Sequence, residues 1–236
     1  ESRMLTMVSQ AMKYKRLIPS LILKNGLLVR SQLFKYHQAI GDPIPTIKRL
    51  SDWSVDEIVL INISNTSKLD SRRDDKWHNI GNANLTNLVK TASAYCFAPL
   101  TIGGGIRSIA QMDELFKCGA DKCMLNTALF EDKDLIGEAI KKFGSQAVVA
   151  SLDFKLNTGN IFSCFIKNGT KDTEMDLIST LEYCYELGVG EILISSIDFD
   201  GSGKGYDPRI LNFLPKQSKV PIIINSGATK TDHFVS

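Results

Sequence analysis

A run of three glycines carries the strongest chemical signal in this sequence. The run 103–105 follows a short apolar segment, and the segment 109–118 behind it has apolar residues at helical spacing. Glycines at a strand-to-helix turn let backbone N–H groups approach a phosphate, and the start of the helix adds a favourable dipole. Asn126 and Thr127 follow the next apolar segment and can donate to the same phosphate. A tight turn that binds nothing has a similar composition and remains the alternative.

Small and polar residues also follow two later apolar segments. They occupy 195–203, after the segment 191–195, and 225–228, after the segment 221–225. If these segments are parallel strands, both clusters lie at the same end of the sheet as the three glycines. Two such clusters would suit a ligand with a phosphate at each end, whereas ordinary turn chemistry is the alternative.

Asp153 is the candidate acid–base residue, because it ends the apolar segment 147–153. A carboxylate at the carboxyl end of a barrel strand can act as a general acid or base, and a structural or helix-capping role is the alternative. The segment 151–159 is similar in sequence to the segment 20–26, as an internal repeat would be. In this repeat, Asp153 corresponds to position 22, where a second carboxylate would be expected. That residue is Ile22, whose side chain cannot transfer protons.

The elements that must position these residues alternate along the chain. Short apolar, β-branched segments predict strands at 17–23, 57–63, 100–102, 122–125, 147–153, 191–195 and 221–225. Helical periodicity predicts helices at 44–54, 84–95, 109–118, 133–143, 174–187 and 208–214. Hairpin-type extensions are predicted at 27–30 and 161–166. Nearly continuous apolar strands alternating with helices indicate an α/β fold whose parallel sheet is covered by helices.

The pattern favours a (β/α)8 TIM barrel over a doubly wound sheet. No G-x-G-x-x-G opens the first helix, which weakens the case for a nucleotide-binding doubly wound fold. The segments 20–26 and 56–61 are echoed in 151–159 and 190–195, which indicates a barrel of two half-barrel repeats.

Only seven strands are predicted, where a barrel of this kind needs eight. We therefore expect residues 12–236 to form one barrel domain that is truncated before strand eight. Its two parallel edges would be unpaired, and the chain alone would be poorly soluble. Residues 1–11 are expected to be an extension outside the barrel.

The composition makes several classes of protein improbable. The 236 residues, 43% of them hydrophobic, suffice for one sizeable core. Because 28 Lys+Arg nearly balance 26 Asp+Glu, nothing indicates binding to nucleic acid or to an anionic membrane. No apolar run approaches the ~20 residues of a membrane span. The five cysteines include no C-x-x-C pair and the three histidines are scattered, so we expect no disulfide framework, no metal site and a cytoplasmic location.

Taken together, motifs spread over residues 15–234 resemble the HisF family, the cyclase subunits of imidazole glycerol phosphate synthase. The motifs are 16–18, 41–43, 56–57, 101–106, 119–122, 126–127, 143–149, 190–193, 196–198, 200–201 and 205–207. The resemblance implies a (β/α)8 barrel that docks a HisH-like glutamine amidotransferase, as a heterodimer, on its amino-terminal face. Ammonia from that partner would pass through the barrel and react with a bis-phosphorylated aminoimidazole carboxamide ribonucleotide, without any cofactor.

The resemblance also implies roles for single residues, which fall into four groups. Asp153 matches one of two essential acid–base aspartates. One phosphate site would comprise Thr101, Gly104, Gly105, Asn126 and Thr127, and the other Asp200, Gly201 and Gly227. The ring of charged residues at the ammonia entrance matches Arg16, Glu57, Lys122 and Glu191, for which a purely structural ion-pair ring is the alternative. Asp121 matches the position that contacts and activates the glutaminase.

Three positions depart from the family pattern. The second catalytic aspartate is Ile22, an acidic residue after the second strand is Asn62, and a lysine after the first strand is Arg30. Because losing a positioned acid or base typically lowers a rate by ~10²–10⁴, we predict weak or absent cyclase activity behind an intact ammonia entrance.

Three functions remain open on this basis. The segments 19–26, 34–35 and 40–43 resemble a paralogue group of HisF linked to acetamidino modification of surface-polysaccharide sugars, where the barrel and its glutaminase supply ammonia to a sugar amidotransferase. We favour this function over a genuine cyclase of histidine biosynthesis. The isomerase that precedes HisF in the pathway also uses an aspartate on its first strand, so Ile22 counts against it equally.

Overall fold

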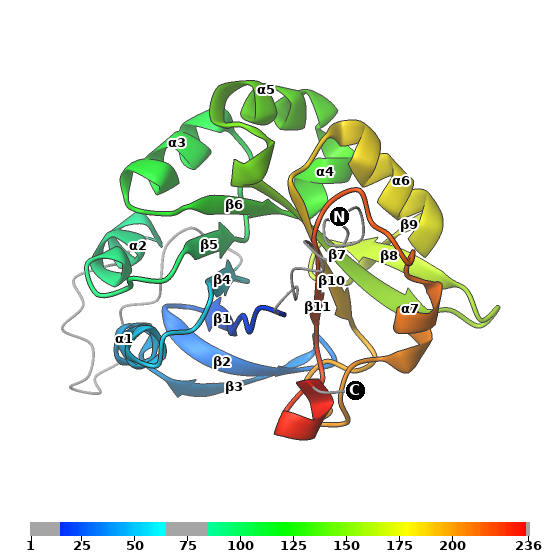
Figure 1. Ribbon diagram of the computed structural model, residues 1–236, viewed down its shortest axis with the longest axis horizontal. Coiled ribbons are helices and arrows are strands. Elements are labelled where there is room, and N and C mark those ends of the chain that lie inside the picture. Colours follow the sequence, from blue (N-terminus) through cyan, green and yellow to red (C-terminus); the bar gives the residue numbers. More distant parts are fainter. Residues whose placement is uncertain (1–14, 65–84, 235–236) are drawn as a thin grey trace, which may run out of the picture.

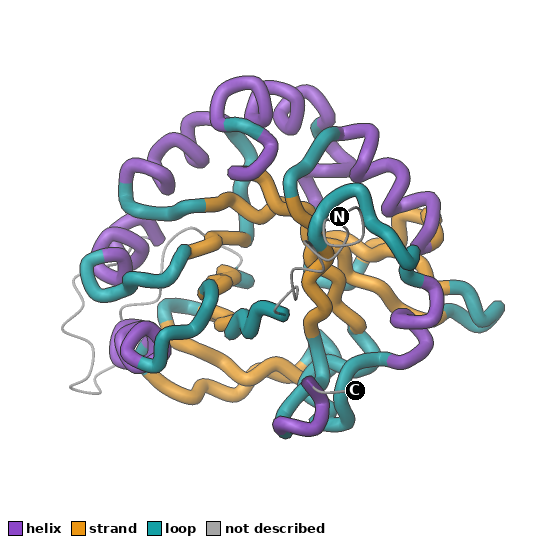
Figure 2. The backbone as a smooth tube through the Cα atoms, viewed as in Figure 1, coloured by secondary structure: helices purple, strands orange, loops and turns teal. Residues whose placement is uncertain are grey.

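The structure is a computed structural model that describes residues 15–64 and 85–234. The extension expected at residues 1–11 lies outside the described residues. A curled sheet forms the middle of the molecule, and the helices α1 to α6 follow one another around its outside (Figures 1 and 2). Among the described residues, no helix is long and apolar enough to cross a membrane.

The described strands form one sheet in the order β11-β10-β7-β6-β5-β4-β1-β2-β3, to which β8 and β9 are added through β7. Seven of them run parallel: β1 (Ser20–Lys24), β4 (Ile58–Asn62), β5 (Leu100–Gly103), β6 (Lys122–Leu125), β7 (Val148–Leu156), β10 (Glu191–Ser196) and β11 (Ile222–Asn225). The remaining four are antiparallel additions: β2 (Leu27–Gln32), β3 (Tyr36–Gly41), β8 (Phe162–Ile166) and β9 (Lys171–Asp176). This curled parallel sheet with outer helices is consistent with the (β/α)8 barrel predicted from the sequence.

The described helices mostly begin after a serine or aspartate whose side chain caps the first turn. They are α1 (Pro43–Asp52), α2 (Leu85–Ser93), α3 (Ile109–Lys117), α4 (Thr127–Glu131), α5 (Lys133–Phe143), α6 (Leu177–Leu187) and α7 (Pro208–Phe213). Asp42 accepts from the N–H of Ile44 at the start of α1, and Asp176 accepts from the N–H of Ser179 at the start of α6. Such caps satisfy N–H groups that the first turn of a helix leaves without partners.

Side chains on the parallel strands alternate between two apolar regions. The outward residues of β4 to β10, such as Leu60, Ile102 and Ile194, pack with the helices in the main core. Inward residues form a second, smaller cluster of Val59, Met124, Val149 and Leu193, against which Ile18, Ile61 and Ile223 pack. Every second residue of a strand therefore faces the barrel interior, where the polar site residues also lie.

The structure corrects three expectations about the elements. The predicted helix 174–187 begins only at Leu177, because Lys171–Asp176 forms strand β9 against β8. The strand β3 and the short helix α4 were not predicted at all. The carboxyl-terminal half of β1 is not an unpaired edge, because Ile22, Leu23 and Lys24 pair with the antiparallel strand β2.

Candidate functional site

A cavity of about 420 Å³ opens at the carboxyl ends of the parallel strands. Its wall contains polar side chains from several strands and from the loops that follow them. They are Lys24, Asn25, Ser31, His37, Asn62, Arg107, Asn126, Thr127, Ser151, Asp153, Asn168, Thr170, Ser195, Asp200 and Asn225. Cavities at this end of a parallel barrel are where ligands bind in such folds.

Asp153 lies in this cavity near the end of β7, on the same inward face as Ser151. Its Oδ2 accepts a hydrogen bond of 3.2 Å from Asn126 Nδ2, which also donates to the backbone oxygen of Ser151 at 2.9 Å. Burial, with a smaller contribution from the charge of Asp200, raises the pKa of Asp153 to about 7. A carboxyl group with this pKa can both donate and accept a proton near neutral pH.

Asp200 also lines the cavity, but its carboxylate already accepts hydrogen bonds from other parts of the protein. Its Oδ2 accepts from Ser31 Oγ at 2.6 Å and from the N–H of Phe34 at 3.1 Å, so it holds the turn between β2 and β3 over the barrel. The side chain of Arg30 approaches the same loop and donates to the backbone oxygen of Gly201 at 3.3 Å. Asp200 is therefore a structural anchor as well as a wall of the cavity.

The glycine turn after β5 forms another part of the cavity wall. Gly104 has a φ of +101°, and a Cβ there would lie 1.9 Å from the backbone oxygen of Asn62, so only glycine fits. Gly105 has open space around it and lines the cavity together with Thr127. A neighbouring hollow of about 660 Å³ shares these residues and adds Lys167. Four of the five residues predicted for the first phosphate site, Gly104, Gly105, Asn126 and Thr127, thus line one cavity, and Arg107 lines it beside them.

Three residues predicted to bind phosphate lie elsewhere or serve another purpose. Thr101 is completely buried at the opposite end of the barrel, where its Oγ1 donates to Glu57 Oε1 at 2.6 Å. The phosphate contact expected of Thr101 stays a prediction, and in this structure its hydroxyl donates to Glu57 instead. Gly201 and Gly227 line neither hollow, and a Cβ on either would lie 2.1 Å from a backbone oxygen. Both glycines permit close packing between loops.

The four charged residues predicted at the amino-terminal end form a closed ring of ion pairs. Lys122 Nζ lies 2.8 Å from Glu57 Oε2 and 2.7 Å from Glu191 Oε2. Arg16 Nη1 lies 3.0 Å from Glu57 Oε2, and Arg16 Nη2 donates to Glu191 Oε1. Burial acts to lower the pKa of Arg16, but its hydrogen bond to Glu191 and the nearby carboxylates raise it overall.

The ring and the inner apolar cluster lie in successive layers. Glu57, Lys122 and Glu191 are each followed two residues later by an inward apolar residue, namely Val59, Met124 and Leu193. Two residues of a strand span about 6.6 Å, so the apolar layer lies directly above the charged layer. Further along the same strands, the cavity begins.

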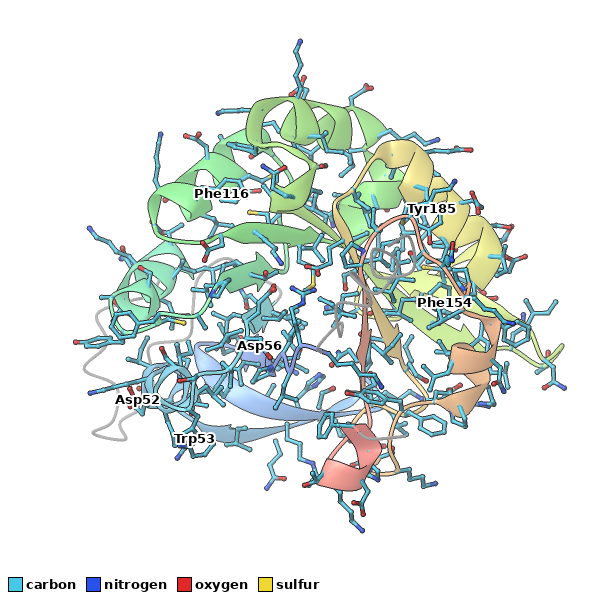
Figure 3. The ribbon with its side chains drawn as sticks, in the orientation of Figure 1. Asp52, Trp53, Asp56, Phe116, Phe154 and Tyr185 are labelled. Carbon is cyan, nitrogen blue, oxygen red and sulfur yellow. The ribbon has the colours of Figure 1, made fainter. Side chains whose placement is uncertain are left out.

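The loops that precede the strands expose apolar side chains around this ring. Trp53, before β4, is 67% exposed, and Phe97, before β5, is 92% exposed. Figure 3 shows Trp53 at the outer edge of the molecule and Asp56 nearer its middle. Asp121, before β6, is exposed, although one of its oxygens accepts from the N–H of Leu100 at 2.8 Å. This face combines apolar and charged groups, as protein interfaces do.

The sequence analysis assigned no role to several polar residues of the cavity wall, among them Lys24 and His37. Lys24 follows Ile22 by two residues on β1 and therefore shares its inward face. That alternation was readable in the sequence, whereas the position of His37 depends on strand β3, which was not predicted. Among the described residues, no group of three or more His, Cys, Asp or Glu side chains could hold a metal ion. All five cysteines are free.

Comparisons with known proteins agree with this geometry. Residues 16–236 match the family described as "Histidine biosynthesis protein". The chain is 36% identical over 225 residues to a protein of Metallosphaera sedula named imidazole glycerol phosphate synthase subunit HisF, covering 95% of this chain and 84% of the relative. Proteins of the same name from Sulfolobus acidocaldarius and Bacillus cereus are 37% and 34% identical, over 95% and 94% of this chain and 85% and 83% of the relatives.

Proposed function

The chain belongs to the histidine biosynthesis protein family and, within it, to the HisF proteins, and from this premise we propose that it is an ammonia-receiving barrel subunit. A glutamine amidotransferase of the HisH type would dock on the amino-terminal face beside Asp121. Its ammonia would pass the ring of Arg16, Glu57, Lys122 and Glu191 and reach the cavity at the other end.

The observation that carries this proposal is the contrast between the two ends of the barrel. At the amino-terminal end, the ring keeps all four charged residues of the family pattern and closes completely through ion pairs. At the carboxyl-terminal end, the wall of the cavity contains Ile22 and Asn62 where the family pattern has acidic residues. A chain used only as a cyclase would be expected to keep its acid–base residues.

The interior between the two ends also suits the passage of a small neutral molecule. The layer of Val59, Met124, Val149 and Leu193 carries no charge and would discriminate against ions. Ser20, which pairs with Val59 of this layer in the register of β1 and β4, has a buried Oγ with no hydrogen-bond partner among the described residues. A hydroxyl in that position can donate to or accept from ammonia.

For the acceptor of the ammonia, we propose the acetamidino modification of surface-polysaccharide sugars, in the cytoplasm and together with a sugar amidotransferase. Support comes from the resemblance of the first strand to the HisF paralogues of that pathway. The retained glycine turn, with Gly105, Asn126 and Thr127 beside Arg107 and Lys167, supports a phosphorylated small molecule in the cavity.

A second candidate is the cyclase of histidine biosynthesis. The names of the relatives favour it, and so does Asp153, whose pKa of about 7 suits acid–base catalysis. Under this alternative, another group in the cavity must do the work that an aspartate at position 22 does in the family.

Turnover of the bis-phosphorylated ribonucleotide with an ammonium salt separates the two candidates. We expect the full-length protein to be slower than an ordinary HisF protein by about 10² or more, and Ile22→Asp to recover part of that rate. Asp153→Asn in the Ile22→Asp background is the matched control and should remove the recovered rate. Turnover by the parent protein within about tenfold of an ordinary HisF protein would instead establish the cyclase.

A further inference from the structure

Lys24 and His37 form a polar pair on the wall of the cavity that neither phosphate site includes. Lys24 lies at the end of β1, His37 lies on β3, and Lys24 Nζ is 3.2 Å from His37 Nδ1. In the ladder between β2 and β3, His37 lies opposite Ser31, which also lines the cavity. The two strands of the hairpin therefore direct these side chains to the same face.

The contact fixes which hydrogen-bond donors the pair can offer. A lysine ammonium group only donates, so His37 Nδ1 must accept and the proton of the neutral ring lies on Nε2. Burial lowers the pKa of His37, and the charge of Lys24 lowers it further, whereas Asp200 raises it. Both lowering effects favour the neutral imidazole, and among the described residues its Nε2–H and two N–H groups of Lys24 have no hydrogen-bond partner.

Within the part of the chain that the structure describes, Lys24 also lacks the counter-ion that other cations near the site possess. Lys122 bridges two carboxylates, and Lys167 lies 2.9 Å from Glu131. Among residues 15–64 and 85–234, no carboxylate lies within 4.0 Å of Lys24 Nζ, although this side chain is half-buried. A half-buried ammonium group beside a neutral imidazole is electrostatically suited to a negatively charged ligand group.

Ile22 makes this environment possible. It lies two residues before Lys24 on the same inward face of β1, and both side chains line the cavity. An acidic side chain at position 22 would supply Lys24 with an internal partner and would repel an incoming anion. With isoleucine there, the positive charge remains available to a ligand.

We propose that Lys24 and His37 form a subsite for an oxyanion of the ligand, a carboxylate or a phosphate, separate from the glycine turn. Lys24 provides the charge, and His37 provides a second, directional donor. This inference rests on one part of the proposed function, namely that the cavity is where the ligand binds. It assigns a binding role to the wall on which the family's acid–base residue is missing.

Side-chain NMR of the histidines tests the subsite directly, because these 236 residues include three of them and the signals are easily separated. The imidazole signals are assigned with His37→Gln and followed while inorganic phosphate or glucuronate is added at constant ionic strength. We expect a saturable shift of the His37 signal and a rise of its pKa, because a bound anion offsets the charge of Lys24. A response to phosphate alone or to glucuronate alone identifies the oxyanion.

Lys24→Met should raise the Kd for the effective probe by about tenfold or more, as loss of a charge-assisted hydrogen bond would. If Lys24→Met does not fold, Lys24→Gln replaces it in this measurement. The matched control is Lys90→Met, which changes an exposed lysine on α2 and should bind the probe with the Kd of the parent.

Two outcomes would overturn the inference and are distinguishable from each other. If the probes shift the backbone amides of Gly105 and Thr127 but leave the His37 signal unchanged, the subsite is wrong while the phosphate-binding part of the proposed function survives. If none of these groups responds to either probe at any concentration, both the subsite and the phosphorylated ligand are wrong.

Discussion

Asp153 shows how one residue's surroundings set its chemistry. It is 8% exposed, and the like charge of Asp200 adds to the effect of burial in raising its pKa. The amide of Asn126 is its hydrogen-bond donor, and no cation within 4.0 Å offsets its charge among the described residues. Burial without a cation therefore holds the carboxyl group near the middle of its titration at neutral pH.

This raised pKa predicts a specific dependence of stability on pH. The folded state keeps the proton of Asp153 up to about pH 7, whereas the unfolded chain releases it near pH 4. The free energy of unfolding should therefore fall as the pH rises from 4 to 7, by up to about 4 kcal/mol from this group. Urea denaturation of Asp153→Asn should show greater stability than the parent at pH 8 and no advantage at pH 4.

Asp134→Asn, at an exposed aspartate on α5, is the control for this comparison and should follow the parent at both pH values. If Asp153→Asn is no more stable than the parent at pH 8, the carboxylate is stabilised by a partner that the structure does not show.

At the scale of elements, the side chains of each strand alternate between the two faces of the sheet, and this alternation brings residues that are distant in the sequence together inside the barrel. The ring residues come from the starts of β4, β6 and β10 and from the segment before β1, and each lies in an inward position. Sequence periodicity was enough to predict these strands and their common direction, because their apolar residues are nearly continuous. It could not predict β3 or β9, whose polar residues pair only with neighbouring hairpin strands.

The same distinction explains which site residues could be predicted. Asp153, Asn126 and the glycine turn end predicted parallel strands, so their meeting followed from the fold. The position of Thr101 beside Lys122 could not be predicted, because that register requires the tertiary structure. His37 was missed for a related reason, since nothing in the sequence shows that its hairpin folds over the cavity.

The ring predicts a large effect from losing one of its cations. Glu57 and Glu191 are 2% and 4% exposed, and Lys122→Met would leave Arg16 as their remaining partner in the ring. We expect the free energy of unfolding to fall by about 3–5 kcal/mol, because a buried carboxylate loses its compensation. Chemical denaturation measures this change.

Lys117→Met removes an ion pair of similar length, between exposed side chains on α3, and should leave stability unchanged. If Lys117→Met and Lys122→Met lower the free energy of unfolding equally, the ring is as well hydrated as the protein surface.

At the scale of the whole molecule, the two ends of the barrel differ in chemistry. The carboxyl-terminal end holds the hydrogen-bonding cavity, whereas the amino-terminal end presents exposed apolar side chains around a closed ring. Aromatic groups that are exposed on one protein often supply much of the binding energy when a partner covers them.

Phe97 therefore predicts where a glutamine amidotransferase partner binds. Phe97→Asp should weaken binding of a purified HisH-type partner by about tenfold or more, measured by calorimetry, without lowering the melting temperature. Ile178→Asp, at a half-exposed position on α6 near the opposite end, should bind normally. A partner that binds Phe97→Asp as tightly as the parent would place the interface elsewhere.

The closed ring has one more physical consequence. Two cations and two carboxylates sum to zero, and Arg16 is the more exposed of the two cations, with 40% of its side chain accessible against 19% for Lys122. Displacing Arg16 would widen the entrance and leave the remaining three groups with a net charge of −1, which attracts ammonium. The apolar layer of Val59, Met124, Val149 and Leu193 beyond it favours the uncharged base. Under the proposed function, the two layers in series would gather ammonium and transmit ammonia, and the proton would pass to a carboxylate of the ring or to water at its mouth.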